Sequence, residues 1–219
     1  MMNGAECGPI LFVRTMPTAQ PRKAHAKPRN RVRIIGGEWR SRLIEFPDVP
    51  GLRPTPDRVR ETLFNWLGQR LTGKRCLDLF AGSGVLGFEA ASRGAEDVVM
   101  VESERAACVA LEENQLKLPA PNCRIVRGDA MTWLARPGAG FDVVFVDPPF
   151  ASGLLPKVLP LLPARLNEGG LVYAEWSEAP AGWLAAHPHI PLEVVREGRA
   201  GNAFFALLSA KPSNETPLP

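Results

Sequence analysis

The sequence has few cysteines and histidines, and it has no apolar run long enough to span a membrane. Its 219 residues include four cysteines and three histidines. Cys7, Cys76, Cys108 and Cys123 form no Cys-x-x-Cys pair and have no histidine at ligand spacing, which argues against a disulfide scaffold or a zinc site. No apolar run approaches the ~20 residues that a membrane span needs, and residues 10–13 are too short for a signal-peptide core. We therefore expect a cytoplasmic protein with reduced thiols, no metal and no membrane contact.

Charge is distributed unevenly along the chain. Residues 1–75 hold 15 Lys/Arg against 6 Asp/Glu, a net charge of +9, whereas the remainder has a net charge of −6. A basic segment on an acidic body is typical of a protein that meets a polyanion at one end. The hydrophobic content of 45% supports one core with a small appendage.

The basic segment divides into a tail and a hairpin. Residues 1–30 are rich in proline and poor in periodicity, which predicts a disordered basic tail. Residues 31–50 predict a β-hairpin, with strands at 32–35 and 38–43 about a Gly36-Gly37 turn. Basic and apolar residues alternate in it, which favours nucleic-acid contact over a merely solvated face. Trp39 either stacks on a base or packs the hairpin onto the body, and we favour packing because an isolated hairpin is marginally stable.

A helix is expected to follow the hairpin. Thr55 suits its N-cap, Pro56 its first position and Asp57 the positive end of its dipole. The apolar stripe comprises Val59, Leu63, Trp66 and Leu67. Arg58 and Arg60 lie off this stripe and are expected to face solvent or a ligand.

From residue 76 onward, short apolar strands alternate with helical patterns. Strands are expected at 76–80, 98–101, 124–126, 141–146 and 171–174, with helices at 86–92 and 105–117. This alternation predicts an α/β domain over 51–209, with a mostly parallel sheet and helices on both faces. Residues 192–197 and 203–208 predict a closing hairpin around 198–202, so one strand can run antiparallel. Residues 210–219 are expected to be a disordered tail.

Acidic residues follow the carboxyl ends of the first strands, where open α/β sheets bind ligands. Residues 82–87 form a Gly-x-Gly-x-x-Gly turn between a strand and a helix, a pattern shared by nicotinamide, flavin and S-adenosylmethionine binders. Asp78 precedes the turn, where a carboxylate suits a ligand ammonium and repels a pyrophosphate. Glu102 is placed to bind ribose hydroxyls. Asp129 either accepts from an adenine amine or caps the following helix.

The tetrapeptide Asp147-Pro148-Pro149-Phe150 closes the strand at 141–146. Each proline keeps the preceding residue extended and lacks an N–H, so this backbone offers mainly acceptors. The Asp147 carboxylate and the Pro148 carbonyl can then accept both hydrogens of one planar amine, with Phe150 stacked on the ring that carries it. We favour this interpretation over a plain turn after a strand.

These motifs resemble those of a known enzyme family. Asp78-Leu79-Phe80-Ala81-Gly82-Ser83-Gly84 together with Asp147-Pro148-Pro149-Phe150 is similar to class I S-adenosylmethionine-dependent methyltransferases that modify exocyclic amines. Residues 33–40 and 53–65 resemble the RsmD family, which methylates guanine N2 in small-subunit (16S) ribosomal RNA. The resemblance covers roughly residues 31–208. Ser41 stands where it leads us to expect glycine.

The resemblance implies a class I methyltransferase fold, Rossmann-like, with a seven-stranded sheet and an antiparallel C-terminal strand. It also implies S-adenosylmethionine as cofactor and ribosomal RNA as substrate, in a partly assembled small subunit; we expect a monomer. The expected catalytic residues are Asp147, Pro148 and Phe150. The expected cofactor-binding residues are Asp78, Phe80, Gly82, Ser83, Gly84, Glu102, Asp129 and Ala130. The expected RNA-binding residues are Arg31, Arg33, Trp39, Arg40, Arg42, Arg53, Thr55, Arg58 and Glu175.

Three alternatives remain open at this point. An amine clamp serves adenine N6 or cytosine N4 in DNA, or a glutamine amide, equally well. A nicotinamide oxidoreductase explains the glycine turn but gives no purpose to residues 147–150. A non-catalytic RNA-binding module explains the basic hairpin but neither the turn nor the clamp.

Overall fold

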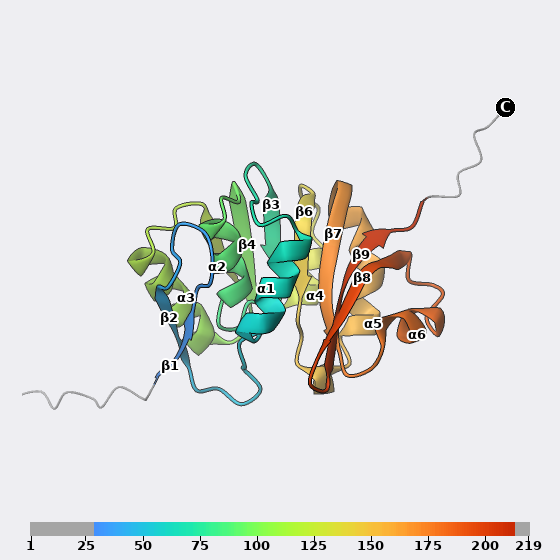
Figure 1. Cartoon of the computed structure of the whole chain (residues 1–219), viewed down its shortest axis with the longest axis horizontal. Helices are drawn as coiled ribbons and strands as arrows, with labels where there is room; N and C mark the ends of the chain where they lie inside the picture. Colours follow the sequence, from blue (N-terminus) through green and yellow to red (C-terminus); the bar gives the residue numbers. More distant parts are fainter. Residues whose placement is uncertain (1–28, 213–219) are drawn as a thin grey trace, which may run out of the picture.

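The computed structural model describes residues 29–212 as an α/β protein built on a seven-stranded sheet (Figure 1). The sheet order is β5-β4-β3-β6-β7-β9-β8, and only β9 runs antiparallel to its neighbours. This confirms the prediction of a mostly parallel sheet with an antiparallel C-terminal strand. The strands are β3 (Arg75–Asp78), β4 (Asp97–Glu102), β5 (Cys123–Arg127), β6 (Phe141–Val146), β7 (Leu166–Trp176), β8 (Leu192–Ala200) and β9 (Ala203–Ala210).

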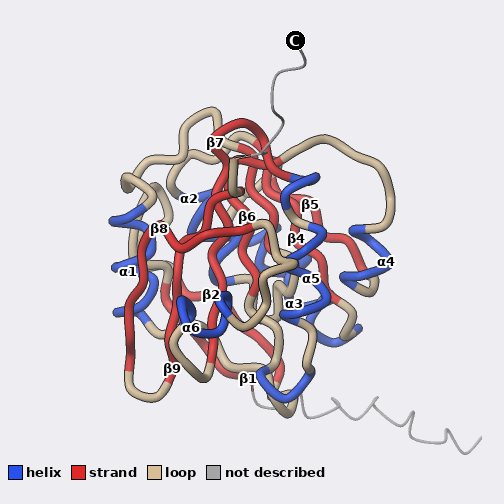
Figure 2. Tube along the Cα trace, turned by 90° about the vertical axis from the view of Figure 1, so that its right-hand side faces the viewer, coloured by secondary structure: helices blue, strands red, loops and turns tan. Residues whose placement is uncertain are grey.

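Helices cover both faces of the sheet, as Figure 2 shows in the edge-on view. One face packs against α1 (Asp57–Trp66), α2 (Val85–Ser92) and α3 (Arg105–Lys117). The other packs against α4 (Ala130–Leu134), α5 (Leu155–Val158) and α6 (Pro180–Ala185). The strands are apolar on both sides because each side is buried beneath helices.

The chain reverses its direction of travel across the sheet between β3 and β6. From β3 it proceeds outward to β4 and β5, and it then returns to the other side of β3 as β6. The connections that follow two adjacent parallel strands diverge where the chain turns to opposite sides of the sheet. This divergence leaves a crevice at the carboxyl ends of the two strands. Asp78, the last residue of β3, and Asp147, the first residue after β6, therefore lie at the edge where a ligand is expected.

The N-terminal hairpin differs from its prediction. Its strands are β1 (Arg29–Arg33) and β2 (Leu43–Pro47), paired antiparallel, and residues 34–42 connect them. The strand predicted at 38–43 about a Gly-Gly turn is therefore wrong. Gly37, at φ 75°, lies against the C-terminal end of α2, where a Cβ would overlap the carbonyl of Ser92. The glycine serves a close approach to α2 rather than a tight turn.

The hairpin is fixed firmly to the body. Val32, Ile34, Ile44 and Phe46 join the core on the α1–α3 face. Beside it, Asn114 of α3 donates to the Glu45 carbonyl at 2.7 Å and accepts from the Glu45 N–H at 3.1 Å. An amide that satisfies both backbone groups of one residue holds β2 in register on α3.

Trp39 packs into this interface. Its side chain is buried in the core on the α1–α3 face, and its backbone N–H donates to the Ser92 hydroxyl at 2.9 Å. Base stacking by Trp39, the alternative to packing, is therefore wrong for the described conformation. Ser41, two residues later, has φ 71°, a left-handed conformation that favours glycine.

The start of α1 also requires a correction. The N-cap is Pro56, with no side-chain capping bond, and Asp57 is the first helical residue. Thr55 is therefore not the cap, and its hydroxyl instead donates to Asp147. Arg60, expected to face solvent or a ligand, is fully buried among other parts of the chain.

Some expectations concern the ends of the chain. The tails predicted at 1–30 and 210–219 lie largely outside the described residues, but Arg29 and Asn30 already belong to β1. Between residues 29 and 212, no helix has the length and apolarity needed to cross a membrane.

Candidate active site

Five neighbouring strands each bring one carboxylate toward the same edge of the sheet. Across the sheet from β5 to β7, these residues are Asp129, Glu102, Asp78, Asp147 and Glu175. Parallel strands place their carboxyl ends together, so residues far apart in sequence become neighbours. The sequence predicted this grouping, and the roles of the individual residues are considered below.

The glycine turn lies between β3 and α2. Gly82 and Gly84 have φ 51° and 78°, and a Cβ on Gly84 would overlap the side chain of Leu111. Ser83 is buried, and its hydroxyl accepts from the Val85 N–H at 3.3 Å. Gly84 thus allows the turn to pack closely against α3, and the turn leads into the N-terminus of α2, where the helix dipole favours a bound anion.

Asp78 is buried beneath this turn. Its Oδ2 accepts from the Gly87 N–H at 3.0 Å. Burial raises the pKa of the Asp78 carboxyl from 3.8 to about 7, and the charge of Glu102 adds to the rise. A cation bound beside it would favour the ionised form.

Glu102 joins the end of β4 to the glycine turn. One carboxylate oxygen accepts from the Gly82 N–H at 2.7 Å, and the other accepts from the Glu104 N–H at 2.7 Å. These bonds fix the backbone on which a ligand would rest. Contact between Glu102 and a ribose stays a prediction.

Asp129 caps α4. Its Oδ1 accepts from the N–H and the hydroxyl of Thr132, at 2.8 and 2.9 Å. These bonds lower the pKa of the Asp129 carboxyl. The capping alternative is therefore observed, and contact of Asp129 or the buried Ala130 with an adenine stays a prediction. Phe80, also predicted to contact the cofactor, is half-buried and packs on the α4–α6 face.

A second group of polar residues surrounds Asp147. The buried Thr55 hydroxyl donates to Asp147 Oδ2 at 3.4 Å. On β7, the Tyr173 hydroxyl donates to Glu175 Oε1 at 2.6 Å. Residues two apart on a strand share a face, which places Tyr173 and Glu175 together. Sequence reasoning missed Tyr173, although this spacing beside Glu175 was visible.

The two carboxyls in this group are hard to ionise. Burial, followed by the charges of Glu175 and Asp78, raises the pKa of Asp147 well above its usual value. Burial likewise raises the pKa of Glu175. The Thr55 hydroxyl opposes the change at Asp147, and the Tyr173 hydroxyl opposes the change at Glu175, because each hydrogen bond favours the charged carboxylate. The site is thus acidic, and a cationic ligand would relieve its self-repulsion.

Asp147 and the two prolines follow β6 directly, and acceptance of an amine by Asp147 and Pro148 stays a prediction. Pro148 is buried and Pro149 is exposed at φ −52°, after which Phe150–Ser152 form a short 3₁₀ helix. The position of the Phe150 side chain lies outside the described part, so its stacking stays a prediction.

Two of the predicted RNA-binding arginines line one groove. Arg31 and Arg53 border a cavity of about 460 Å³ between the hairpin and residues 48–54. Leu52, in the same lining, is the side chain that a Cβ placed on Gly82 would meet, at 3.6 Å, so one wall of the groove adjoins the glycine turn. Arg40 lies elsewhere, in a larger groove of about 800 Å³ at the C-terminal end of α2. That groove lies at the amino edge of the sheet, away from the carboxylates.

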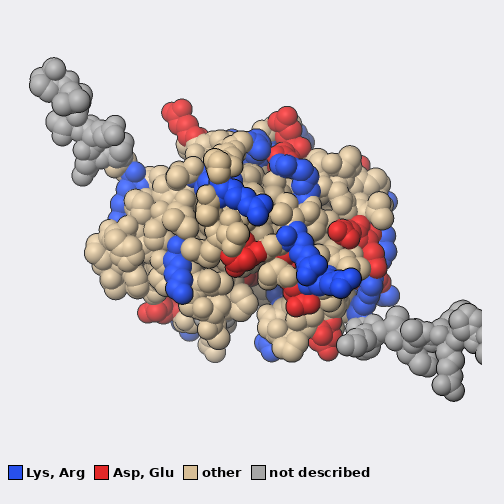
Figure 3. Space-filling model, turned by 180° about the vertical axis from the view of Figure 1, so that it is seen from behind, with Lys and Arg blue, Asp and Glu red and all other residues tan. Residues whose placement is uncertain are grey.

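The other predicted RNA contacts are dispersed. Arg33 and Arg58 are exposed, and the exposed Arg42 donates to the Lys117 carbonyl at 3.1 Å. On the face seen in Figure 3, basic side chains lie singly or in small groups among acidic ones rather than in one stripe. The groove with Arg31 and Arg53 is therefore the structural feature that links basic side chains to the carboxylate edge.

Comparison with known proteins agrees with this geometry. Residues 32–209 match a family model described as "Conserved hypothetical protein 95". The ribosomal RNA small subunit methyltransferase D of Escherichia coli is 44% identical over 189 residues, which cover 84% of this chain and 93% of that protein. Its namesake from Haemophilus influenzae is 42% identical, covering 66% of this chain and 78% of that protein.

Solved structures give the same answer for the fold. The putative methyltransferase yhhF from Escherichia coli superimposes with a TM-score of 0.70 at 43% identity, covering 83% of this chain and 99% of that one. A putative methylase from Haemophilus influenzae superimposes with a TM-score of 0.67 at 32% identity, covering 83% and 99%. The class I methyltransferase fold is thus confirmed, and the chain belongs to the RsmD family, whose model is described as "Conserved hypothetical protein 95".

Proposed function

We propose that this protein transfers a methyl group from S-adenosylmethionine to the exocyclic N2 amine of a guanine in small-subunit ribosomal RNA, within a partly assembled subunit. The observation that carries the proposal is the position of Asp147 and Pro148 directly after β6, beside Asp78 at the switch point of the sheet. The acceptors for an amine, Asp147 and Pro148, therefore lie next to Asp78, where a cationic cofactor would bind. The names of the relatives support ribosomal RNA as the substrate.

The residues at the glycine turn fit S-adenosylmethionine better than a dinucleotide. Asp78 suits the ammonium of the methionine moiety, and the N–H groups at the start of α2 suit its carboxylate. A pyrophosphate would instead meet the carboxylates of the buried Asp78 and the partly exposed Glu102. Glu102 and Asp129 are assigned to the ribose and the adenine.

S-adenosylmethionine supplies a methyl group on a positively charged sulfur. The protein's task is to prepare the nucleophile, since the lone pair of the guanine amine is delocalised into the ring. Asp147 and the Pro148 carbonyl accept its two hydrogens, which favours a pyramidal nitrogen with its lone pair directed at the methyl group. Phe150 stacks on the base. The contribution of the protein is positioning, together with acceptors placed where positive charge develops.

Asp147 must be ionised for this role, although burial raises its pKa. The positive charge of the cofactor favours the ionised carboxylate, so cofactor binding prepares the amine site. The methylated amine then transfers its excess proton to the Asp147 carboxylate, which releases it to solvent. Glu175, which accepts a hydrogen bond from Tyr173, raises the pKa of Asp147 by its charge and is assigned to a base contact.

The N-terminal arm, which comprises the β1–β2 hairpin and the segment up to Pro54, supplies affinity for the RNA backbone. Arg31 and Arg53 face a shared groove and are assigned to phosphates, as are the exposed Arg33, Arg40, Arg42 and Arg58. Phosphate contacts position the RNA without reading its sequence. The choice of one guanine therefore depends on the fit of an extruded base beside Asp147.

The decisive test is transfer of tritium from labelled S-adenosylmethionine to ribosomal RNA from cells that lack the enzyme, followed by nucleoside analysis. We expect label in N2-methylguanosine, with small-subunit particles labelled faster than naked RNA. Label in N6-methyladenine or N4-methylcytosine of DNA would establish the alternative exocyclic-amine activity instead. Calorimetric titration with S-adenosylmethionine and with NAD distinguishes a methyltransferase from a nicotinamide oxidoreductase. We expect a heat of binding with S-adenosylmethionine and none with NAD.

A further inference from the structure

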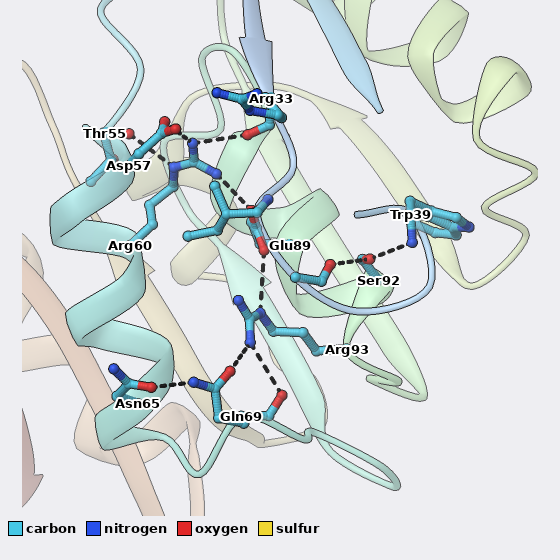
Figure 4. Close-up of polar contacts among 12 residues, drawn as sticks. Arg33, Trp39, Thr55, Asp57, Arg60, Asn65, Gln69, Glu89, Ser92 and Arg93 are labelled. Atoms are coloured by element: carbon cyan, nitrogen blue, oxygen red, sulfur yellow. Dashed lines mark hydrogen bonds and ion pairs between the residues drawn. The ribbon is translucent and has the colours of Figure 1, made fainter. Parts of the chain in front are cut away.

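The buried Arg60 binds four groups from different parts of the chain (Figure 4). Its Nη1 donates to Glu89 Oε1 at 2.6 Å, and its Nε donates to the Thr55 carbonyl at 3.0 Å. Its Nη2 donates to the Arg33 carbonyl at 2.9 Å and to Asp57 Oδ1 at 2.5 Å. The planar guanidinium, with five donors in fixed directions, can satisfy these acceptors together.

The partners of Arg60 belong to three structural units. Arg33 ends β1 of the arm, Thr55 precedes α1, and Glu89 lies in the middle of α2. Glu89 also accepts from the N–H of Ile35, just beyond β1. One buried ion pair thus fixes the arm, the segment before α1 and the cofactor helix relative to one another.

Thr55 connects this ion pair to the amine site. Arg60 holds the Thr55 carbonyl, and the Thr55 hydroxyl donates to Asp147 Oδ2 at 3.4 Å. We infer that Arg60 is a positioning residue: it acts through Thr55 to place a hydrogen-bond donor against Asp147, and it ties that placement to the RNA-binding arm. This inference rests on the proposed function, in which Asp147 binds the amine.

Direct electrostatic action of Arg60 on Asp147 does not explain this link. The charged groups that act on Asp147 are Glu175 on β7 and Asp78 on β3, and Tyr173 titrates beside them. Arg60 is not among these groups. Its influence on Asp147 must pass through Thr55, whose hydrogen bond lowers the pKa of Asp147. Loss of that bond therefore moves the acid limb of the activity profile to higher pH, since Asp147 must be ionised to act.

Arg93 offers a matched control. It is a second buried arginine that pairs with the same carboxylate, with its Nε 3.2 Å from Glu89 Oε2. Its other hydrogen bonds go to Gln69, at the far end of α1 from Thr55. Arg93→Lys therefore disturbs the buried pair without touching the segment that contacts Asp147.

The experiment measures kcat against pH, cofactor affinity and thermal stability for Arg60→Lys, Thr55→Val, the double variant and Arg93→Lys. We expect Arg60→Lys to lower kcat by about 10–100-fold through misplacement, with cofactor Kd nearly unchanged. Its acid limb moves to higher pH, as in Thr55→Val, and the double variant shows no further movement. Arg93→Lys lowers stability but keeps the acid limb of the natural protein.

Equal loss of stability in Arg60→Lys and Arg93→Lys, with neither acid limb displaced, overturns the inference. Should Arg60→Lys not fold, an unmoved acid limb in Thr55→Val overturns the inference equally, because the inferred route from Arg60 to Asp147 passes through the Thr55 hydroxyl. Asp147→Asn distinguishes a failure of the role assigned to Asp147 from a failure of the role assigned to Arg60. Asp147→Asn with turnover near the natural value removes the assigned role of the Asp147 carboxylate, whereas a strongly impaired Asp147→Asn with an unmoved Arg60→Lys profile removes only the role of Arg60.

Discussion

The hydroxyl of Thr55 lies 3.4 Å from the carboxylate of Asp147, although 92 residues separate the two in the chain. Thr55 precedes α1 and Asp147 follows β6, so this contact joins the segment after the arm to the amine site. The contact also supplies a hydrogen-bond donor to a carboxylate that is otherwise difficult to ionise.

Asp147→Ala should lower turnover by about 10²–10³-fold, because it removes a preorganised acceptor that acts where positive charge develops. Cofactor affinity should stay close to that of the natural protein, since Asp78 and the glycine turn are unchanged. Single-turnover methylation and calorimetric titration measure the two quantities. Turnover near the natural value would remove Asp147 from its assigned role.

Asp78→Asn should make the cofactor-free protein more stable at pH 8. The pKa of Asp78 is raised from 3.8 to about 7 in the fold, so the native state binds more protons than the unfolded state between these values. Stability contributed by the protonated form is therefore lost as pH rises from about 4 to about 7. We expect a gain of the order of 2–4 kcal/mol at pH 8 that shrinks toward pH 4, as measured by urea unfolding.

The same variant should bind S-adenosylmethionine far more weakly. The asparagine side chain would keep an acceptor for the Gly87 N–H but lose the charge that suits an ammonium. In the natural protein, binding near pH 7 should release about half a proton from Asp78, because a neighbouring cation favours the carboxylate. Calorimetry in buffers of different ionisation enthalpy measures this release. Tight binding by Asp78→Asn would place the ammonium elsewhere.

Arg31→Ala and Arg53→Ala should weaken RNA binding and leave cofactor binding intact. Each lost phosphate contact should reduce the slope of log affinity against log salt by about 1. Arg196→Ala, on the exposed edge strand β8 at the opposite end of the sheet from β5, is the matched control and should keep both affinity and slope. Filter binding at several salt concentrations provides the comparison. A slope equal to the natural one in the arm variants would argue for a different RNA path.

Ser41→Gly should stabilise the protein by about 1 kcal/mol, because a non-glycine residue in a left-handed conformation is strained. Ser41 has φ 71° and is exposed, so the change removes no buried contact. Urea unfolding measures the difference. Ser177→Gly, at another exposed serine after β7, is a control in which no gain is expected.

The sequence predicted features that depend on local pattern. β6 and α3 have the predicted bounds, 141–146 and 105–117, because apolar runs and periodicity define them without outside help. The grouping of acids followed from the same pattern, since strand ends of a parallel sheet meet at one edge.

Features that depend on distant partners were predicted wrongly. Arg60 was expected to face solvent or a ligand, but Glu89 and the backbone carbonyls of Arg33 and Thr55 satisfy its guanidinium in the interior. No helical periodicity reveals such partners. The connection at 34–42 was predicted as a tight turn because Gly37 is a turn residue, whereas its actual constraint is the nearby C-terminal end of α2.

The acidic edge has a consequence for the end of the catalytic cycle. Asp78, Asp147 and Glu175 attract a ligand in proportion to its positive charge, and their mutual repulsion grows when that charge is lost. Once the methyl group has departed, the sulfur of the spent cofactor is neutral. If these carboxylates hold the charged donor as we propose, we expect them to hold its demethylated product less tightly and so to favour exchange of used cofactor for fresh.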